Sequence, residues 1–230
     1  MAEGYRILAP FPKNRFLRDW GPMTRSLTEI VSGIHTWSWF SEDKGYNFNG
    51  HFVRHAEGNL AIDPVEVPKP VMKALVSRGV SRILLTNRNH SRDSMALKEA
   101  TGAKILIHAG DAAAAGAEGA LIEGDLVHGA RIGPFTVVPA AGKSSGEIAL
   151  HWPERRILVV GDVCVGNPPG EVSLLPDRVM DDPGELRRSL RRIVAEVDFD
   201  TLLVGDGASL LKGAKAAVSR LLTRLEDDVT

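Results

Sequence analysis

The chain has almost no cysteine and no long apolar run, and each absence excludes a class of protein. Cys164 is the single cysteine among 230 residues, so neither an intramolecular disulfide framework nor a cysteine-based zinc finger can form. A lone thiol is typical of a reducing compartment. No stretch approaches the ~20 apolar residues of a membrane span, and the first twenty residues lack the apolar core of a secretory signal. We therefore expect a cytoplasmic protein with no membrane partner.

Charge of either sign is not in excess. The chain carries 28 Lys and Arg residues against 29 Asp and Glu residues, a formal net charge of −1. A uniformly basic surface for nucleic acid is therefore not expected, and we predict a small molecule as the partner instead. Hydrophobic residues make up 43% of the chain and charged residues 25%, and these values are ordinary for a globular domain that buries a real core.

Regular apolar patterns begin near residue 28. Residues 1–27 contain Pro10, Pro12 and Pro22 and keep no sustained period, which predicts an irregular N-terminal arm. Such an arm could pack on a second copy of the chain, so a homo-oligomer is possible. Residues 28–230 show neither a low-complexity linker nor a repeat of 20–50 residues, which predicts one domain.

Short apolar runs alternate with amphipathic segments along this domain. The runs predict strands at 29–40, 47–54, 60–64, 83–85, 105–107, 135–138, 147–152, 157–160 and 202–204. Helices are predicted at 68–78, 94–100, 112–115, 209–225 and behind a capping box at 182–185. Residues 121–132 show turn signals. Two mixed sheets packed face to face, with helices outside, would bury all the apolar stripes. This arrangement is an α/β (α+β) fold in four layers, αββα.

Polar loops follow or precede several predicted strands, and such loops are where reactive groups collect. They lie at 62–64, 86–93, 141–146, 161–162 and 205–207.

The order and spacing of these loops resemble the metallo-β-lactamase superfamily, from about residue 28 to the end of the chain. Members of that family carry, in order, a His-x-His-x-Asp-His loop, a Gly-His-Thr-x-Gly loop, a Gly-Asp strand end with the bridging ligand, and a Gly-His-Gly strand end. The matching segments are Thr86-Asn87-Arg88-Asn89-His90-Ser91-Arg92-Asp93, Gly142-Lys143-Ser144-Ser145-Gly146, Gly161-Asp162 and Gly205-Asp206-Gly207. The resemblance implies the metallo-β-lactamase αββα sandwich.

The resemblance also implies that most metal ligands of the family are replaced. In the simplest register, the family's four metal-binding histidines and its loop aspartate and loop histidine correspond to Asn87, Asn89, Lys143, Asp206, Ser91 and Arg92. Only Asp162 is unchanged. If the loop has gained one residue, His90 and Asp93 approach the former metal positions instead, and both registers stay open.

A lysine at a ligand position changes what the centre can hold. An ammonium group has three donors and no free lone pair, and it ligates a metal only when deprotonated, which nearby carboxylates oppose. The acids and cations that we expect to balance in the cleft are Asp93, Asp162 and Asp206 against Lys143, Arg88 and Arg92. We therefore expect no two-zinc centre and, most simply, no cofactor. The alternative is one weakly held divalent ion on His90, Asp93, Asp162 and Asp206, with manganese, iron or magnesium favoured over zinc.

Three functions follow as hypotheses. In the first, the cleft around Lys143, Asp162 and Asp206 binds a polar or anionic small molecule, with further binding residues at Asn87, Asn89, His90, Asp93, Ser144 and His51. In the second, the protein hydrolyses an ester, thioester, lactone or phosphodiester. One divalent metal, or Lys143 as electrophile with Asp162 or Asp206 as base, would then activate water. In the third, the chain is a non-catalytic structural or interaction protein and the paired cleft only stabilises it.

Cys164 lies two residues beyond Asp162. A nucleophilic thiol needs a base, for which His90 is the candidate. We expect a buried structural thiol instead.

Overall fold

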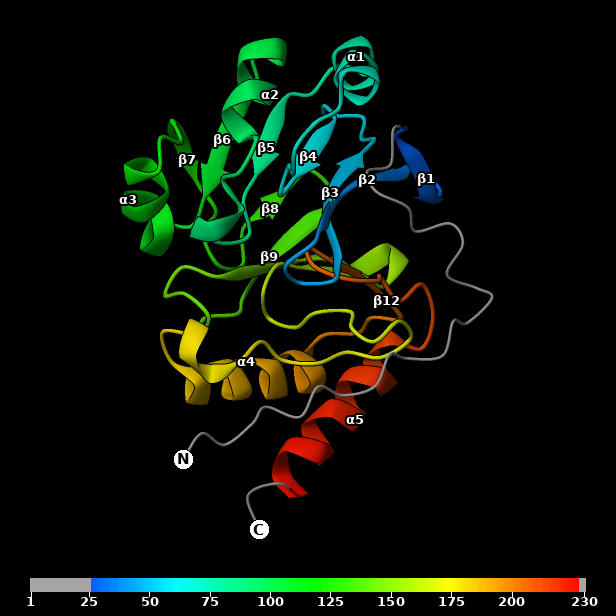
Figure 1. The fold of residues 1–230 in the computed structure, drawn as a ribbon, viewed down its shortest axis with the longest axis vertical. Helices are drawn as coiled ribbons and strands as arrows, with labels where there is room; N and C mark the ends of the chain where they lie inside the picture. Colours follow the sequence, from blue (N-terminus) through cyan, green and yellow to red (C-terminus); the bar gives the residue numbers. More distant parts are fainter. Residues whose placement is uncertain (1–25, 228–230) are drawn as a thin grey trace, which may run out of the picture.

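The computed structural model describes residues 26–227, in which two β-sheets lie between two layers of helices (Figure 1). Residues 1–25 of the predicted N-terminal arm lie outside the described residues. The four-layer αββα arrangement predicted from the apolar pattern is confirmed.

The first sheet has seven strands in chain order. They are β1 (Thr28–Val31), β2 (Ile34–Ser41), β3 (Tyr46–Val53), β4 (Leu60–Ile62), β5 (Arg82–Leu84), β6 (Lys104–Ile107) and β7 (Ile122–Asp125). β1 to β4 pair antiparallel, and β4 to β7 pair parallel. The parallel half needs crossover connections, and these contain the helices α1 (Lys69–Arg78), α2 (Ser94–Thr101) and α3 (Ala109–Ala117).

The second sheet has five strands in the order β12-β11-β10-β9-β8. Their bounds are β8 (Arg131–Ile132), β9 (Phe135–Pro139), β10 (Ile148–Trp152), β11 (Ile157–Val160) and β12 (Thr201–Val204). β11 and β12 pair parallel, and the other pairs are antiparallel. The crossover between β11 and β12 contains α4 (Pro183–Glu196), and α5 (Ala214–Asp227) ends the described chain. Three short 3₁₀ turns complete the elements, at Arg88–His90, Pro153–Arg155 and Asp177–Val179.

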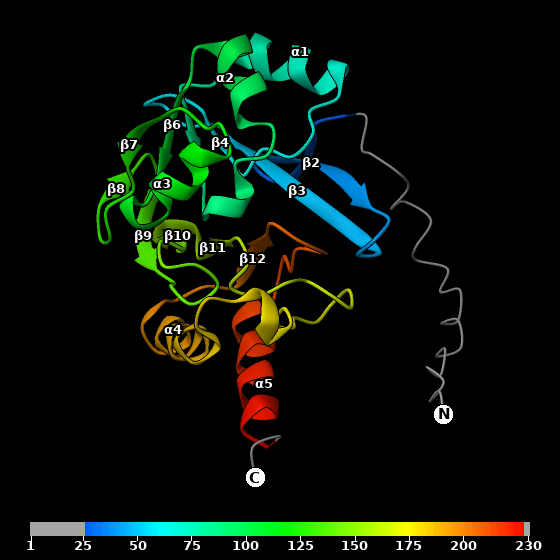
Figure 2. The same ribbon diagram turned by 60° about the vertical axis from the view of Figure 1, so that its left-hand side comes forward.

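Three separate apolar clusters fill the spaces between the layers. One contains Leu75 and Leu97 and lies between the first sheet and its helices. A second, with Leu150 and Val159, lies between the two sheets. The third packs α4 and α5 on the outer face of the second sheet, as Figure 2 shows from the side. Each sheet therefore buries both faces, which explains the nearly continuous apolar strands. Within residues 26–227, no helix is long and apolar enough to cross a bilayer.

The start of α4 follows its sequence signal closely. Asp182 precedes the helix and its Oδ1 accepts a hydrogen bond from the backbone N–H of Glu185 at 2.8 Å. Pro183 occupies the first turn, where its missing N–H costs nothing. Leu186, Leu190 and Ile193 then form the buried stripe.

Two predictions about elements were wrong. The last helix begins at Ala214 rather than near 209, because Leu210 exchanges two backbone hydrogen bonds with Leu202 and therefore stays extended. Residues 121–132 contain strands β7 and β8 rather than turns alone. β7 forms because β6 offers a parallel partner, with Ile122 opposite Ile105, and pairing of this kind overrides local turn signals.

Candidate functional site

Loops at one end of both sheets converge on a buried polar cluster. Asp63 follows β4, residues 86–93 follow β5, Asp162 follows β11 and Asp206 follows β12. The two sheets are joined there by backbone hydrogen bonds, from Ile148 N–H to the Thr86 carbonyl at 2.9 Å and from Asn49 N–H to the Gly205 carbonyl at 2.7 Å. The four-layer packing therefore brings together acids that are up to 143 positions apart in the chain, Asp63 and Asp206.

His90 lies between two carboxylates. Its Nδ1 is 2.8 Å from Oδ2 of Asp63, and its Nε2 is 3.4 Å from Oδ1 of Asp162. The backbone and hydroxyl of Thr86 donate to the same Asp63 carboxylate at 2.8 and 2.6 Å and fix its orientation. Burial and the nearby Arg92 lower the pKa of His90, but Asp63 and Asp162 outweigh them and raise it to about 10. The ring is therefore a cation at neutral pH.

Lys143 reaches into the same cluster from the loop before β10. Its Nζ lies 3.2 Å from Oδ2 of Asp162 and donates to Oδ1 of Asn89 at 2.7 Å. The side chains of Lys143 and Asp162 are only 9% and 6% exposed. Burial raises the pKa of Asp162, but His90 and Lys143 more than offset this effect and hold that pKa well below its usual range. Asp162 is therefore ionised.

Arg92 pairs with the second carboxylate of the cluster. Its Nη2 donates to Oδ1 of Asp206 at 3.1 Å, and its guanidinium lies 4.5 Å from the centre of the Phe48 ring. Burial raises the pKa of Asp206 in spite of the opposing charge of Arg92. The Nη1 atom of Arg92 is buried and has no hydrogen-bond partner among residues 26–227, so one donor of the guanidinium is left over.

Two buried acids hold the loops around this cluster. Asp111, in the first turn of α3, accepts hydrogen bonds from the backbone of Arg88, the hydroxyl of Ser144 and the backbone of Gly146. Glu147 accepts from the backbone N–H of Asp162 at 2.7 Å and from the Asn87 amide at 3.3 Å. Burial, helped by Asp162, raises the pKa of Glu147 well above its usual value. Asp111 and Glu147 thereby connect the loop of residues 141–146 (the lysine loop) to the loop of residues 86–93 (the histidine loop).

Glycines at 161 and 205 let the histidine loop come close. A Cβ atom at Gly161 would lie 2.2 Å from Oγ1 of Thr86, and one at Gly205 would lie 2.6 Å from Cε1 of His90. Neither separation is compatible with a side chain. The Gly-Asp pairs at the ends of β11 and β12 are thus explained by close packing as well as by their carboxylates.

A sequence profile of the metallo-beta-lactamase superfamily matches residues 26–225. The chain belongs to the metallo-β-lactamase superfamily. Its curated relatives include a hydroxyacylglutathione hydrolase of Cereibacter sphaeroides, 40% identical over 124 residues, with 50% of this chain and 47% of the relative covered. A hydroxyacylglutathione hydrolase from another strain of that species is 34% identical over 164 residues, which cover 67% and 60%. This chain spans about half to three-fifths of the length of these relatives.

Solved structures of superfamily members share the fold. TTHA1623 in a di-iron-bound form has a TM-score of 0.62 and 24% identity, with 76% of this chain and 93% of that chain covered. The metallo-β-lactamase FIM-1 from Pseudomonas aeruginosa, in a mono-zinc form, has a TM-score of 0.70 and 16% identity, with 89% and 96% covered. At these identities the likeness concerns the fold alone.

Within this superfamily fold, most of the predicted site residues meet. Lys143 contacts Asn89 and Asp162, and Asp162 faces His90. Asp206 lies beside them, since His90, Asp162 and Asp206 can each offer one ligand atom within 4.8 Å of the others. The side-chain amide of Asn87 instead donates a hydrogen bond to Glu147.

Three predicted binding residues and one predicted charge make their contacts outside this cluster, although Asp93 also lines a cavity beside Arg92. Oδ2 of Asp93 accepts from the backbone of Val67 at 2.8 Å, and the hydroxyl of Ser144 donates to Asp111. His51 is 1% exposed and its Nε2 lies 3.2 Å from the Val204 carbonyl. Arg88 forms its ion pair with Asp181. The predicted charge balance is corrected accordingly, with Asp63 in place of Asp93 and His90 in place of Arg88.

Sequence reasoning missed several residues that build the site. The sequence pattern places Asp63 only within a polar loop, and it does not distinguish Asp111 or Glu147 from other acidic residues. Asp111 follows His108 in an alanine-rich helix start, and Glu147 follows the glycine that ends the lysine loop. An acid beside a small-residue helix start was the available signal for Asp111, but it is weak.

The cluster contains donor atoms that could hold one metal ion. His90, Asp162 and Asp206 are the one such group found among residues 26–227, and Nε2 of His90 has no hydrogen-bond partner there. One imidazole nitrogen, once His90 has lost a proton, and two carboxylate oxygens form a mainly oxygen-based set that fits manganese, iron or magnesium. Lys143 and Arg92 already pair with Asp162 and Asp206, so a metal ion would compete with these protein cations for the two carboxylates.

Two cavities border the Arg92–Asp206 pair. One of about 310 Å³ is lined by Trp39, Phe48, Val65, Glu66, Arg92 and Asp93. Another of about 230 Å³ is lined in part by Tyr46, Asn47 and Gly207, next to Asp206.

Cys164 does not line either of these cavities. Its thiol is 1% exposed and burial raises its pKa to about 12, which confirms the expectation of a buried, unreactive thiol.

Proposed function

We propose that this superfamily member binds a polar or anionic small molecule, at a centre that protein cations hold together in place of two metal ions. The observation that carries the proposal is the pairing of both convergent carboxylates. Asp162 is paired with Lys143 at 3.2 Å, and Asp206 with Arg92 at 3.1 Å. An ammonium or guanidinium group at such a distance competes with a metal ion for the same carboxylate and neutralises its charge.

The charges of the cluster support this proposal. Three acids, Asp63, Asp162 and Asp206, meet three cations, His90, Lys143 and Arg92. At about 4 Å and an effective dielectric constant of about 20, each pair attracts by roughly 4 kcal/mol before desolvation is subtracted. Metal ions would add positive charge to a cluster in which three cations already balance the three acids.

Arg92 connects the cluster to a cavity. It lines the 310 Å³ cavity, where Trp39 and Phe48 supply apolar walls. Its Nη1 is buried and unpartnered among the described residues, so a carboxylate, sulfonate or phosphate group that displaced a neighbouring side chain would find a free donor there. Lys143 and Asp162 are more deeply buried than Arg92, and their opposite charges balance each other beside Asp206, the partner of Arg92.

A hydrolase is the second candidate, because the curated relatives are named hydroxyacylglutathione hydrolases. One divalent ion on His90, Asp162 and Asp206 would supply Lewis-acid activation of water. Without an ion, Lys143 would stabilise the developing oxyanion while Asp162 or Asp206 accepted the proton of water. The substrate would be a thioester, ester, lactone or phosphodiester.

The two candidates are separated by metal analysis together with ligand and activity screens of the purified protein. We expect less than one metal ion per chain, thermal stabilisation by one class of anionic small molecule, and loss of that stabilisation in Arg92→Gln. Arg131→Gln is the matched control, since Arg131 pairs with Glu154 at the surface. Two firmly bound ions per chain would overturn the proposal. Hydrolysis of one substrate class together with a single bound ion would establish the second candidate instead.

A further inference from the structure

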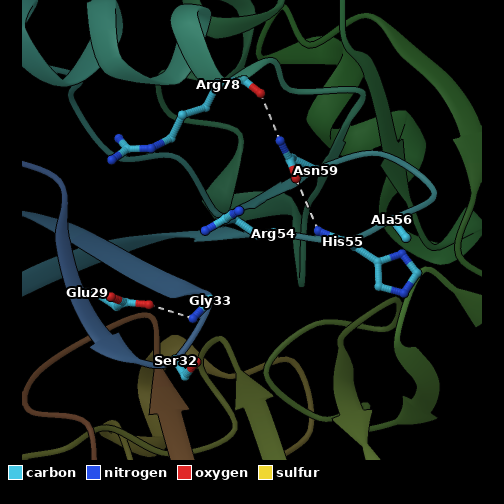
Figure 3. Close-up of a pocket in the computed structure, with 8 residues that line it drawn as sticks. All are labelled: Glu29, Ser32, Gly33, Arg54, His55, Ala56, Asn59 and Arg78. Carbon is cyan, nitrogen blue, oxygen red and sulfur yellow. Dashed lines mark hydrogen bonds between the residues drawn. The ribbon is translucent and has the colours of Figure 1, made fainter.

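A second polar cavity lies at the opposite end of the first sheet. It has a volume of about 740 Å³, and Arg54 and Arg78 stand on its wall (Figure 3). Arg54 directly follows β3, whereas Tyr46 begins β3 beside the candidate site. Eight residues of extended chain at about 3.3 Å each separate the two ends by roughly 26 Å. This Arg54–Arg78 cavity is therefore distinct from the candidate site.

The two arginines of the cavity have no partners of their own. Among residues 26–227, neither guanidinium takes part in an ion pair, a hydrogen bond or a ring contact. Elsewhere in this part of the chain, arginines usually do, as Arg156 does with Asp198 and Arg224 with Glu171. In Figure 3 the side chains of Arg54 and Arg78 extend to the same side of the view. Two unpaired cations from different elements thus share one hollow.

Several acceptors on the cavity wall are already used by the protein. Oε1 of Glu29 accepts from the backbone N–H of Gly33 at 2.7 Å, and the Ser32 carbonyl accepts from Arg155 at 2.6 Å. The amide of Asn59 joins the carbonyl of Arg78 to the backbone N–H of His55. The donors of both guanidinium groups are left free while these acceptors are engaged, and such a wall favours an anion.

Besides burial, the positive charge of the two arginines lowers the pKa of a buried neighbour, His35. Burial lowers the pKa of His35, and Arg78 and Arg54 lower it further, against the opposing effect of Glu29. Glu29 is the one acidic residue on the wall of the cavity, so the wall carries two cations against one anion. The local field is therefore positive in a chain whose net charge is −1.

We propose that the Arg54–Arg78 cavity binds the phosphate group of a small molecule. Guanidinium groups present a planar fork of donors that matches phosphate oxygens, and two forks from different directions suit a tetrahedral dianion better than a planar carboxylate. The volume leaves room for the organic part of a phosphate ester beside the phosphate itself.

The test is a titration of the purified full chain with inorganic phosphate and with pyrophosphate, followed by calorimetry and by ³¹P NMR. We expect binding by the wild type, and a dissociation constant raised by roughly tenfold or more in Arg54→Gln/Arg78→Gln. The matched control is Arg178→Gln/Arg220→Gln, which removes the same charge from exposed arginines that also lack ion pairs but lie outside the cavity. The control should bind as the wild type does.

Three results would overturn the proposal. They are an absence of binding by the wild type at about 10 mM of either anion, unchanged binding in the Arg54/Arg78 variant, and an equal loss in the control. Arg92→Gln separates this cavity from the candidate site. It should leave intact the component of phosphate binding that Arg54→Gln/Arg78→Gln removes, and a loss of that component in the Arg92 variant would place the phosphate at the candidate site instead. The outcome is independent of whether the function proposed for that site holds.

Discussion

The Nζ atom of Lys143 lies 3.2 Å from Oδ2 of Asp162, and both side chains are more than nine-tenths buried. This ion pair joins the loop before β10 to the end of β11. Because it is buried, each partner depends on the other, and removal of one leaves an uncompensated charge in a low-dielectric surrounding.

We predict that Lys143→Met destabilises the protein by about 3 kcal/mol. Asp162→Asn should also be destabilising, and the double variant should cost less than the sum of the two by about 1–3 kcal/mol. Urea unfolding of the four proteins at pH 7 measures this coupling. Lys98→Met is the control, because Lys98 pairs with the partly exposed Glu123 and should lose less than about 1 kcal/mol. Strict additivity at positions 143 and 162 would contradict the pairing.

Removal of the two cations should create an affinity for metal. In Lys143→Met/Arg92→Gln, the carboxylates of Asp162 and Asp206 lose their protein partners and face His90 within 4.8 Å. We expect millimolar Mn²⁺ to raise the melting temperature of this variant by mass action, and to leave the wild type unchanged. EDTA should likewise not alter the wild type. A wild type that melts lower after EDTA treatment would show that a resident ion, rather than Lys143, holds the centre.

Gly205 should not tolerate a side chain. A Cβ atom there would lie 2.6 Å from the His90 ring, so Gly205→Ala must displace the ring or the end of β12. We expect a loss of about 1–3 kcal/mol in unfolding free energy. Gly116→Ala is the matched control, since Gly116 lies in α3 with nothing near its Cβ position, and it should be neutral or slightly stabilising. Equal stability of the two variants would contradict the packing described for His90.

His51 should make the protein less stable in mild acid. Burial lowers its pKa from the usual 6.5 to about 4, so the folded protein holds this ring neutral. The unfolded chain takes up a proton near pH 6.5, and the folded protein resists it. The contribution of His51 is therefore complete above pH 6.5 and is lost as the pH falls towards 4, by up to about 3 kcal/mol.

Urea unfolding of the wild type and of His51→Gln at pH 7.5 and at pH 4.5 measures this contribution. A glutamine can keep the contact with the Val204 carbonyl but does not titrate. The stability gap between wild type and variant should shrink at the lower pH in favour of the variant. A gap that is independent of pH would refute the assignment.

Local pattern in the sequence was sufficient to predict the layers and the position of the cluster. The apolar strands at 157–160 and 202–204 bury both faces, and such runs need a sheet covered on two sides. Their parallel pairing places Asp162 and Asp206 side by side, since each lies two residues past its strand. The lysine at 143 was equally visible, and so was its consequence that an ammonium group would stand among acids.

Which loop residues face inward was decided only by tertiary structure. The 3₁₀ turn at Arg88–His90, capped by Asn87, directs His90 to Asp63 and Asp162, and a positive φ at Arg92 sends Asp93 outward to Val67. One-residue changes in a turn redirect every later side chain, and no periodic signal marks them. Asp111 and Glu147 became recognisable only when two distant loops were packed together, because a buried acid is identified by the donors around it and these donors come from remote parts of the chain.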